Sequence, residues 1–175
     1  FCVMHPVGTI HAQNSPIDAL GADLQKLAQG VNTLDTTYLA EALREEANRF
    51  AARMNEGQFF FYAKEYDRAA MVLLDLVETP ANRGQAGFRD AVYFLAESLY
   101  LLRNYKASRR FLEQLYEIGS QDQKEHALAR LLDMALIIQD KALGQRYAGI
   151  AESFASRGAK SALLYALGKY HAKND

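Results

Sequence analysis

Hydrophobic side chains recur at intervals of three or four residues through most of this 175-residue chain, and that spacing places them on one face of an α-helix. The longest regular run extends from Leu39 to Phe61, with successive steps of 4, 4, 3, 4, 3 and 4 residues. No proline interrupts this run, so it predicts one long helix over about 37–63. The same periodicity predicts a shorter helix that runs to about Val77, and further helices over about 88–102, 105–118, 121–138, 141–156 and 160–173.

Residues with special backbone preferences predict where the first helices begin and end. Ser15 before Pro16 predicts the start of an N-terminal helix, because Ser caps free N–H groups and Pro suits the first helical position. Gly30 predicts the end of that helix, and a linker is expected to follow through Asp35. The stretch 79–87, with its Pro, Asn and Gly residues, predicts the clearest loop of the chain.

Similar signals predict the boundaries of the later helices. The dipeptide Tyr66–Asp67 predicts a tight turn between the long helix and the helix that runs to about Val77. Gly119 predicts a helix end, and Ser120 followed three residues later by Gln123 predicts a capping box. Gly158 predicts a further helix end.

The amino-acid composition assigns the fold class. The chain contains 28 Ala and 23 Leu but only 17 Val, Ile and Thr together. Ala and Leu are strong helix formers, whereas β-branched residues lose rotamer freedom in helices and favour strands. Only three prolines occur, all before residue 81. These numbers predict an all-α protein.

Helix pairs joined by short turns indicate an internal repeat. When the turns are aligned, small or apolar residues occupy equivalent positions at separations of 39, 36 and 36 residues. The loop at 79–87 accounts for the longer first interval. The equivalent residues are Gly57, Ala96, Leu132 and Gly168.

Two segments carry the repeat most clearly: Gly57, Phe60, Tyr66 and Ala69 in the first, and Leu95, Ala96, Tyr105 and Ser108 in the second. This pattern resembles the tetratricopeptide repeat (TPR) family, whose units are antiparallel helix pairs of about 34 residues. The resemblance implies an all-α, TPR-like α-solenoid behind an N-terminal helical extension at 15–49. The implied repeats are about 50–87, 88–119, 121–157 and a partial unit at 160–175.

The two ends of the chain raise separate expectations. Residues 1–14 are expected to be a disordered leader or the remnant of a signal peptide, in which the small Ala12 suits a cleavage site. The last helix either caps the solenoid or is followed by further repeats. Tyr165 and Gly168 favour continuation, because they are repeat-like where a cap needs a polar face.

The segment from Tyr93 to Tyr100, followed by Tyr105, looks like repeats of bacterial envelope proteins such as the Tol–Pal coordinator and the outer-membrane assembly lipoprotein. This looser resemblance implies a periplasmic or envelope-associated location; a cytoplasmic one is the alternative. No lipobox is visible before Cys2, so lipidation is not predicted.

The chain lacks the familiar motifs of catalysis and metal binding. None of its four histidines lies in a metal-ligand spacing, and its single cysteine forms no zinc or disulfide framework. No phosphate-binding glycine loop and no nucleophile motif occurs. We therefore expect no enzyme, no metal and no cofactor, and His126 is expected to be solvated or to cap a helix.

The resemblance implies a concave groove lined by the first helix of each repeat. Carried over by alignment, the groove residues are Met54, Gln58, Phe61, Tyr62, Tyr93, Glu97, Tyr100, Leu101, Asp133, Ile137, Tyr165, Lys169 and Lys173. The aromatic members suit an extended or helical peptide, unless half of them simply pack between helices. The family's carboxylate clamp needs Lys and Asn where Met54 and Gln58 stand, so that specificity is not expected.

Charge and hydropathy narrow the partner. The net charge of −1 argues against nucleic-acid binding, and no apolar run is long enough to span a bilayer. Residues 1–80 carry a net charge of −5, whereas residues 141–175 carry +4. The predicted function is a non-catalytic scaffold that binds a protein or peptide partner; a regulatory or targeting module of a larger enzyme is the alternative.

Overall fold

The computed structural model describes residues 16–155 and 158–174, with side chains from residue 39 to residue 173 outside 156–157. The chain divides into two units, Phe1–Glu46 and Ala47–Asp175, and the second unit holds the packed helices. All regular structure in the described part of the chain is helical. The elements are α1 (Pro16–Tyr62), α2 (Tyr66–Glu78), the 3-10 helix η1 (Pro80–Gly84), α3 (Phe88–Leu101), α4 (Tyr105–Ile118), α5 (Gln121–Ile137), α6 (Lys141–Ala155) and α7 (Ser161–Asn174).

The N-terminal helix differs from the prediction. Helix α1 runs without a break through Gly30 and Asp35, so the predicted helix end and linker are wrong. A glycine inside a helix costs only about 1 kcal/mol relative to alanine, and no proline lies in the interval. The helix-favouring residues on both sides of this interval therefore keep α1 continuous across Gly30 and Asp35. The predicted cap Ser15 lies outside the described residues.

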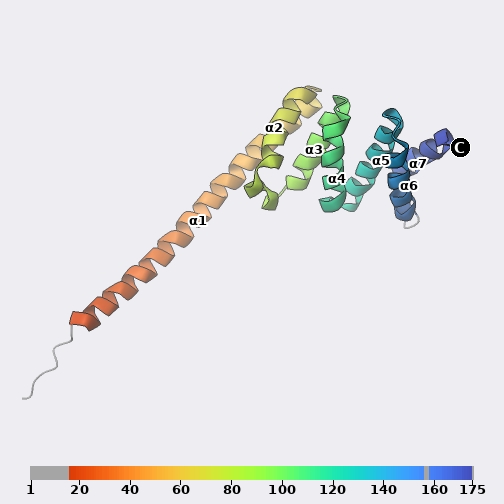
Figure 1. Ribbon diagram of the computed structural model, residues 1–175. Helices are drawn as coiled ribbons and strands as arrows, with labels where there is room; N and C mark the ends of the chain where they lie inside the picture. Colours follow the sequence, from red (N-terminus) through yellow and green to blue (C-terminus); the bar gives the residue numbers. More distant parts are fainter. Residues whose placement is uncertain (1–15, 156–157, 175) are drawn as a thin grey trace, which may run out of the picture. The chain divides into compact units, whose positions relative to one another are not determined.

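The second unit confirms an all-helical fold built by packing of helix pairs. Helices α2 to α7 follow one another as a row of packed elements, and short turns reverse the chain between α3 and α4 and between α5 and α6 (Figure 1). Helix α5 packs against α4, α6 and α7. Fully buried leucines fill the interior: Leu73, Leu95, Leu112, Leu115, Leu128, Leu132 and Leu163.

One turn recurs three times, at the ends of α1, α3 and α5. In each copy a non-glycine residue adopts a left-handed conformation: Lys64 (φ 63°), Arg103 (φ 59°) and Gln139 (φ 56°). In each copy the next N–H donates to the carbonyl five residues earlier, over 2.9–3.0 Å. This hydrogen bond satisfies a carbonyl that the helix end would leave free. The turn positions are separated by 39 and 36 residues, so the backbone repeats with the spacing read from the sequence.

The details of the turns refine the predicted boundaries. The first turn was predicted at Tyr66–Asp67 but lies directly before it, at 63–65. Tyr66 is instead the first residue of α2. The predicted loop at 79–87 contains η1, and the buried Asn82 secures it by donating from Nδ2 to the carbonyl of Leu76 over 2.9 Å. The predicted capping box at the start of α5 is confirmed.

Small residues allow the helices of a pair to approach closely. An added Cβ at Gly57 in α1 would lie 2.7 Å from side-chain atoms of Leu73 in α2. In the next pair, the hydroxyl of the fully buried Ser108 in α4 donates to the carbonyl of Ala96 in α3 over 3.0 Å. Equivalent positions of consecutive pairs thus have the same packing role.

Candidate binding groove

Helices α3, α5 and α7 are connected side by side through polar contacts between residues 33 or 36 positions apart. Glu97 of α3 pairs with Arg130 of α5, and Tyr100 of α3 donates to Asp133 of α5. Asp133 in turn pairs with Lys169 of α7. The separation of 36 equals the repeat spacing between α5 and α7, and the separation of 33 is about one helical turn shorter than the spacing between α3 and α5. The three helices therefore present one continuous surface, which we call the groove.

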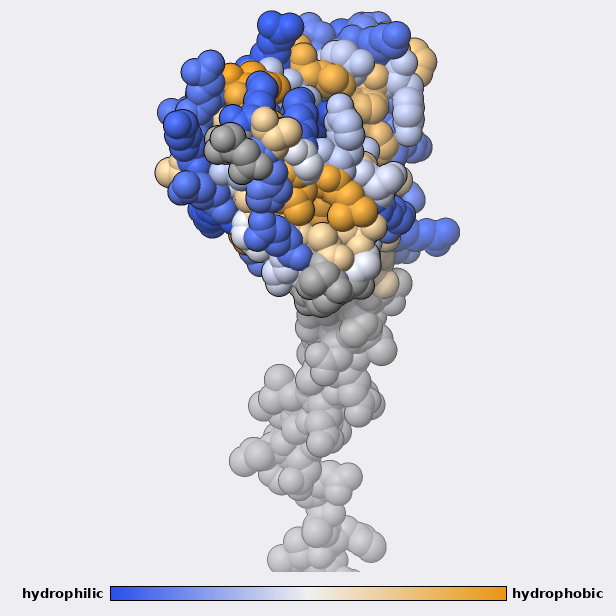
Figure 2. Space-filling model, turned by 90° about the vertical axis from the view of Figure 1, so that its right-hand side faces the viewer, coloured by the Kyte–Doolittle hydropathy of each residue, from blue (hydrophilic) through white to orange (hydrophobic). Residues whose placement is uncertain are grey.

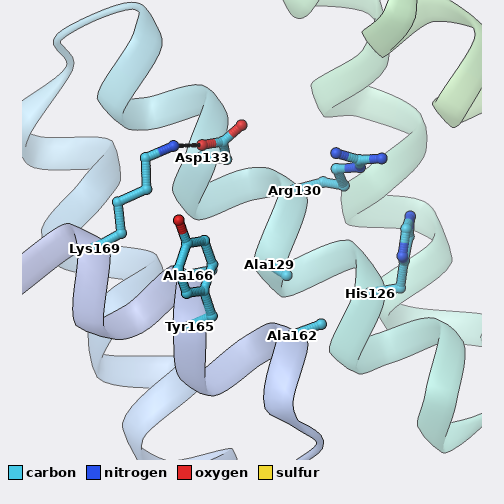
Figure 3. Close-up of a pocket in the computed structure, with 8 residues that line it drawn as sticks. All are labelled: His126, Ala129, Arg130, Asp133, Ala162, Tyr165, Ala166 and Lys169. Carbon is cyan, nitrogen blue, oxygen red and sulfur yellow. Dashed lines mark hydrogen bonds and ion pairs between the residues drawn. The ribbon is translucent and has the colours of Figure 1, made fainter.

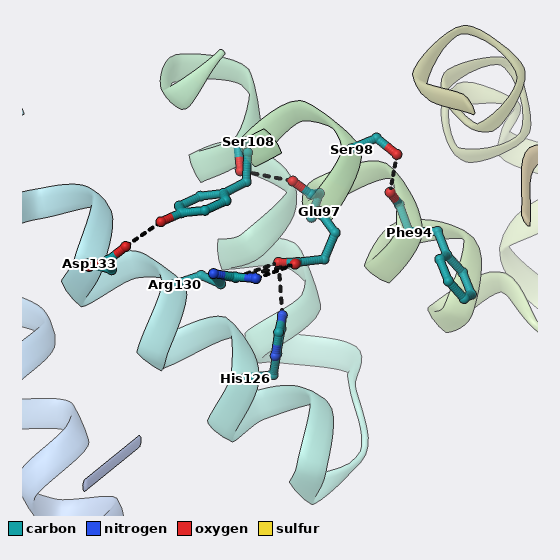
Figure 4. Close-up of polar contacts among 9 residues, drawn as sticks. Phe94, Glu97, Ser98, Ser108, His126, Arg130 and Asp133 are labelled. Carbon is teal, nitrogen blue, oxygen red and sulfur yellow. Dashed lines mark hydrogen bonds and ion pairs between the residues drawn. The ribbon is translucent and has the colours of Figure 1, made fainter. Parts of the chain in front are cut away.

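Glu97 is the most buried carboxylate of the groove. Its side chain is only 4% exposed, and Arg130 donates to its two oxygens over 2.8, 3.0 and 3.2 Å. Nε2 of His126 lies 2.8 Å from the same carboxylate (Figure 4). Burial alone would raise the pKa of Glu97, but the contacts with His126 and Arg130 outweigh it and hold the pKa below the ordinary value. The carboxylate therefore stays charged and joins α3 to α5.

A second cluster lies one helical turn further along. The hydroxyl of Tyr100 donates to Asp133, and the guanidinium of Arg130 lies 4.4 Å from the centre of the Tyr100 ring. Burial and the hydrogen bond to Asp133 raise the pKa of Tyr100. Burial opposes ionisation of Asp133, but the hydrogen bonds from Lys169 and Tyr100 lower its pKa overall. The cluster fixes the side chains of Arg130 and Asp133, which line a hollow between α5 and α7.

A hollow of about 380 Å³ lies in the groove between α5 and α7. Three alanines, Ala129, Ala162 and Ala166, leave the space, and the ring of Tyr165 stands beside it (Figure 3). The remaining lining residues are His126, Arg130, Asp133 and Lys169. The hollow thus combines an apolar floor with a polar border, and that combination suits one apolar side chain of a ligand with polar neighbours.

The N-terminal end of this surface is aromatic. Phe61 and Tyr62 of α1 contact Phe94 of α3 edge to face, with ring centres 5.0 and 5.8 Å apart. Tyr93 packs against Phe94 and lies 5.0 Å from the ring of His126. Burial is the first cause of the raised pKa of Tyr93. Phe61, Tyr93 and Phe94 are partly or fully buried and hold the helices together, whereas the ring of Tyr62 remains 71% exposed.

The predicted groove residues separate into three groups. Exposed members are Tyr62 (71%), Leu101 (41%), Ile137 (47%), Tyr165 (75%), Lys169 and Lys173. Half-buried members are Gln58, Phe61, Tyr93 and Asp133. Met54 belongs to the core, and Glu97 and Tyr100 are also buried, so these three offer a partner little surface. Asp133, Tyr165 and Lys169 are brought together around the hollow.

Several groove residues were missed from the sequence. Arg130 and His126 were not predicted, although Arg130 follows Glu97 by 33 positions, close to the repeat spacing, and carries the opposite charge. His126 was expected to be solvated or to cap a helix, but it lies inside α5 and is partly buried against Glu97 and Tyr93. The alanines of the floor carry no signal of their own, since alanine is abundant throughout the chain.

Comparison with known proteins supplies no relative. No family model, no curated protein sequence and no solved structure matches this chain. Within the part of the chain that the structure describes, no group of His, Cys, Asp and Glu side chains is arranged to hold a metal ion. No helix there is both long enough and apolar enough to cross a bilayer.

Proposed function

We propose that this chain is a non-catalytic, TPR-like scaffold that binds a peptide segment of a partner protein in the groove of α3, α5 and α7. The observation that carries the proposal is the hollow between α5 and α7, with an apolar floor, an exposed Tyr165 ring and charged side chains at its border. The helix pairs and the recurring contacts at 33 and 36 residues support the TPR-like assignment.

The shape of the hollow indicates what it would bind. Ala162 and Tyr165 lie on α7, Ala129 lies on α5, and Ala166 is held in place because it is part of the buried core. An apolar side chain that enters would bury its surface at about 25 cal/mol per Å². Because the helices are already positioned by the contacts of Glu97 and Asp133, little ordering of the site opposes binding.

Filling the hollow tests this function. A random peptide library displayed on phage is selected on the immobilised chain, and the affinity of the enriched peptide is measured for two leucine variants. Ala162→Leu adds bulk inside the hollow, whereas Ala172→Leu adds the same bulk at an exposed position of the same helix outside it. We expect Ala162→Leu to weaken binding about tenfold or more, corresponding to about 1.4 kcal/mol, and Ala172→Leu to leave it unchanged.

A second pair of variants tests the aromatic contribution. Tyr165→Ala removes an exposed ring beside the hollow, and Phe59→Ala removes a similarly exposed ring (68%) away from it. If only Tyr165→Ala loses affinity for the enriched peptide, the result supports peptide binding in the groove. The proposal fails if no peptide is enriched, or if the enriched peptide binds all four variants like the unaltered chain.

A further inference from the structure

The turns that follow α1, α3 and α5 expose large hydrophobic side chains at equivalent positions. Tyr62, Leu101 and Ile137 are separated by 39 and 36 residues, the same intervals as the left-handed residues of these turns. Leu102 and Ile138 are the next residues of the second and third turns, and they are 43% and 44% exposed. None of these five side chains lines the hollow between α5 and α7, so they form a surface of their own.

The three turns lie along one edge of the packed helices, which we call the turn edge. The chain reverses at each turn, so the turns after α1, α3 and α5 come to one edge and the loops after α2 and α4 come to the opposite edge (Figure 1). Lys173 of α7 also reaches the turn edge, because it lines a small hollow together with Gln139, Asp140 and Lys141. At the corresponding upper end of the packed helices, Figure 2 shows hydrophobic residues lying among hydrophilic ones.

The opposite edge has a different surface. Among the described residues of the loops after α2 and α4 and the helix ends beside them, the one exposed large hydrophobic side chain is Ile118, with 38%. The exposed arginines Arg83 and Arg89 are accompanied there by the exposed acids Asp90 and Glu117. Exposed apolar side chains are therefore a property of the turn edge and not of helix ends in general.

The turn edge also carries basic side chains that have no acidic partner. These residues are Lys64, Arg103, Lys106, Lys141 and Lys173. Each is exposed, and none forms an ion pair with another residue that the structure describes. Two acidic side chains beside them are engaged locally: Glu65 pairs with Arg68, and Asp140 accepts from the N–H of Leu143 over 3.0 Å. Asp67 is exposed, but the basic side chains of the edge still outnumber the acidic ones.

We propose that the turn edge binds the surface of a bilayer that contains anionic lipids. The hydrophobic side chains enter the boundary between headgroups and acyl chains, and the basic side chains contact the lipid phosphates. Charge complementarity favours this occupant. A fluid bilayer also accepts separate side chains at the tips of three turns, whereas a protein partner needs one contiguous and closely packed apolar patch. The turn edge is independent of the peptide groove, so either site can fail its test without the other.

Co-sedimentation of the full chain with lipid vesicles tests this binding. Vesicles of phosphatidylcholine with about one third phosphatidylglycerol present an anionic surface, and vesicles of phosphatidylcholine alone are the neutral control. We expect the chain to sediment with the anionic vesicles and to remain in solution with the neutral ones, and added salt should weaken the binding. The variant Ala162→Leu, which fills the hollow between α5 and α7, should bind the anionic vesicles like the unaltered chain.

Two matched pairs of variants locate the contact. Ile138→Ser and Ile118→Ser remove the same side chain from the turn edge and from the opposite edge, at 44% and 38% exposure. Arg103→Gln and Arg89→Gln likewise remove one exposed charge from each edge. Gln139 already occupies the left-handed position equivalent to Arg103, so Arg103→Gln should keep the fold, as circular dichroism will show. We expect Ile138→Ser to weaken binding to anionic vesicles about tenfold and Arg103→Gln about fivefold, and both control variants to change it less than about twofold.

Tryptophan fluorescence reports whether the turn enters the bilayer. The chain contains no Trp, so one introduced Trp gives an unambiguous signal. Emission of the Ile138→Trp variant should shift to shorter wavelength when anionic vesicles are added, whereas that of Ile118→Trp should not. The proposal is overturned if neutral vesicles bind the chain equally well or if the variants of the two edges behave alike. Absence of vesicle binding also overturns it and would leave the turn edge to an acidic protein surface.

Discussion

The substitution Glu97→Gln tests whether the buried carboxylate joins α3 to α5. Gln keeps the volume of the side chain but removes the charge that faces Arg130 and His126. Removing one partner of a buried ion pair typically costs about 3–5 kcal/mol. The side chains of Arg130 and His126 remain 32% and 30% exposed, so water partly replaces the lost carboxylate. We therefore expect a loss of about 2 kcal/mol in the free energy of unfolding, below the fully buried range.

Urea denaturation followed by circular dichroism measures this loss. With a slope of about 1–3 kcal/mol per molar urea, the unfolding midpoint should fall by roughly 1 M. The matched control is Asp90→Asn, because Asp90 also links α3 to α5, accepting from Nε2 of Gln123 over 2.8 Å, but at an exposed position. It should cost less than about 0.5 kcal/mol. Equal losses in the two variants, or no loss in Glu97→Gln, would refute the role assigned to Glu97.

Acidification gives a second readout of the same contact. The pKa of Glu97 is lower in the folded chain than its ordinary value of 4.5. The ion pairs therefore contribute fully above pH 4.5, and their contribution is lost as the pH falls through the lower, folded-state pKa. The stability difference between the unaltered chain and Glu97→Gln should shrink over that window, since protonated Glu97 resembles Gln. A difference that stays constant down to the acid transition would contradict this.

Three further predictions concern glycine packing, a helix cap and a turn, and each is measured by the same urea denaturation. Gly57→Ala should destabilise the chain by about 1–3 kcal/mol, because the added Cβ would overlap Leu73. Gly149→Ala should stabilise the chain by about 0.5–1 kcal/mol, because its Cβ would enter open space, and similar effects at both sites would be inconsistent with this packing. Ser120→Ala should cost about 1 kcal/mol by removing the cap of α5, unless the Gln123 side chain alone suffices. Gln139→Gly should stabilise the turn by about 1 kcal/mol, since glycine adopts positive φ without strain; a loss would show that the side chain matters more.

Much of the fold could be predicted from the sequence because its signals are local. The capping box of Ser120 and Gln123 needs only residues three apart. The spacing from Gly57 through Ala96 also reappears in the turns after α1 and α3. The break at Gly30 was predicted wrongly, because a single glycine weakens a helix without ending it.

The candidate site was less predictable because it depends on distances between helices. Tyr165 and Lys169 were selected from the repeat alignment, and both border the hollow. Met54 occupied an equivalent alignment position but lies in the core. The alignment assigns a residue to a helix position, and only the packing of neighbouring helices decides whether that position is open or covered.

The sequence by itself determined the all-helical class, most helix boundaries and the repeat spacing, because these follow from periodicity and backbone preference over a few residues. The tertiary structure alone decided that Glu97 is buried between Arg130 and His126, that three alanines leave a hollow, and that Leu73 fills the space beside Gly57. The physical reason is that burial and pairing depend on residues 33 to 36 positions away, which approach one another only when the helices pack.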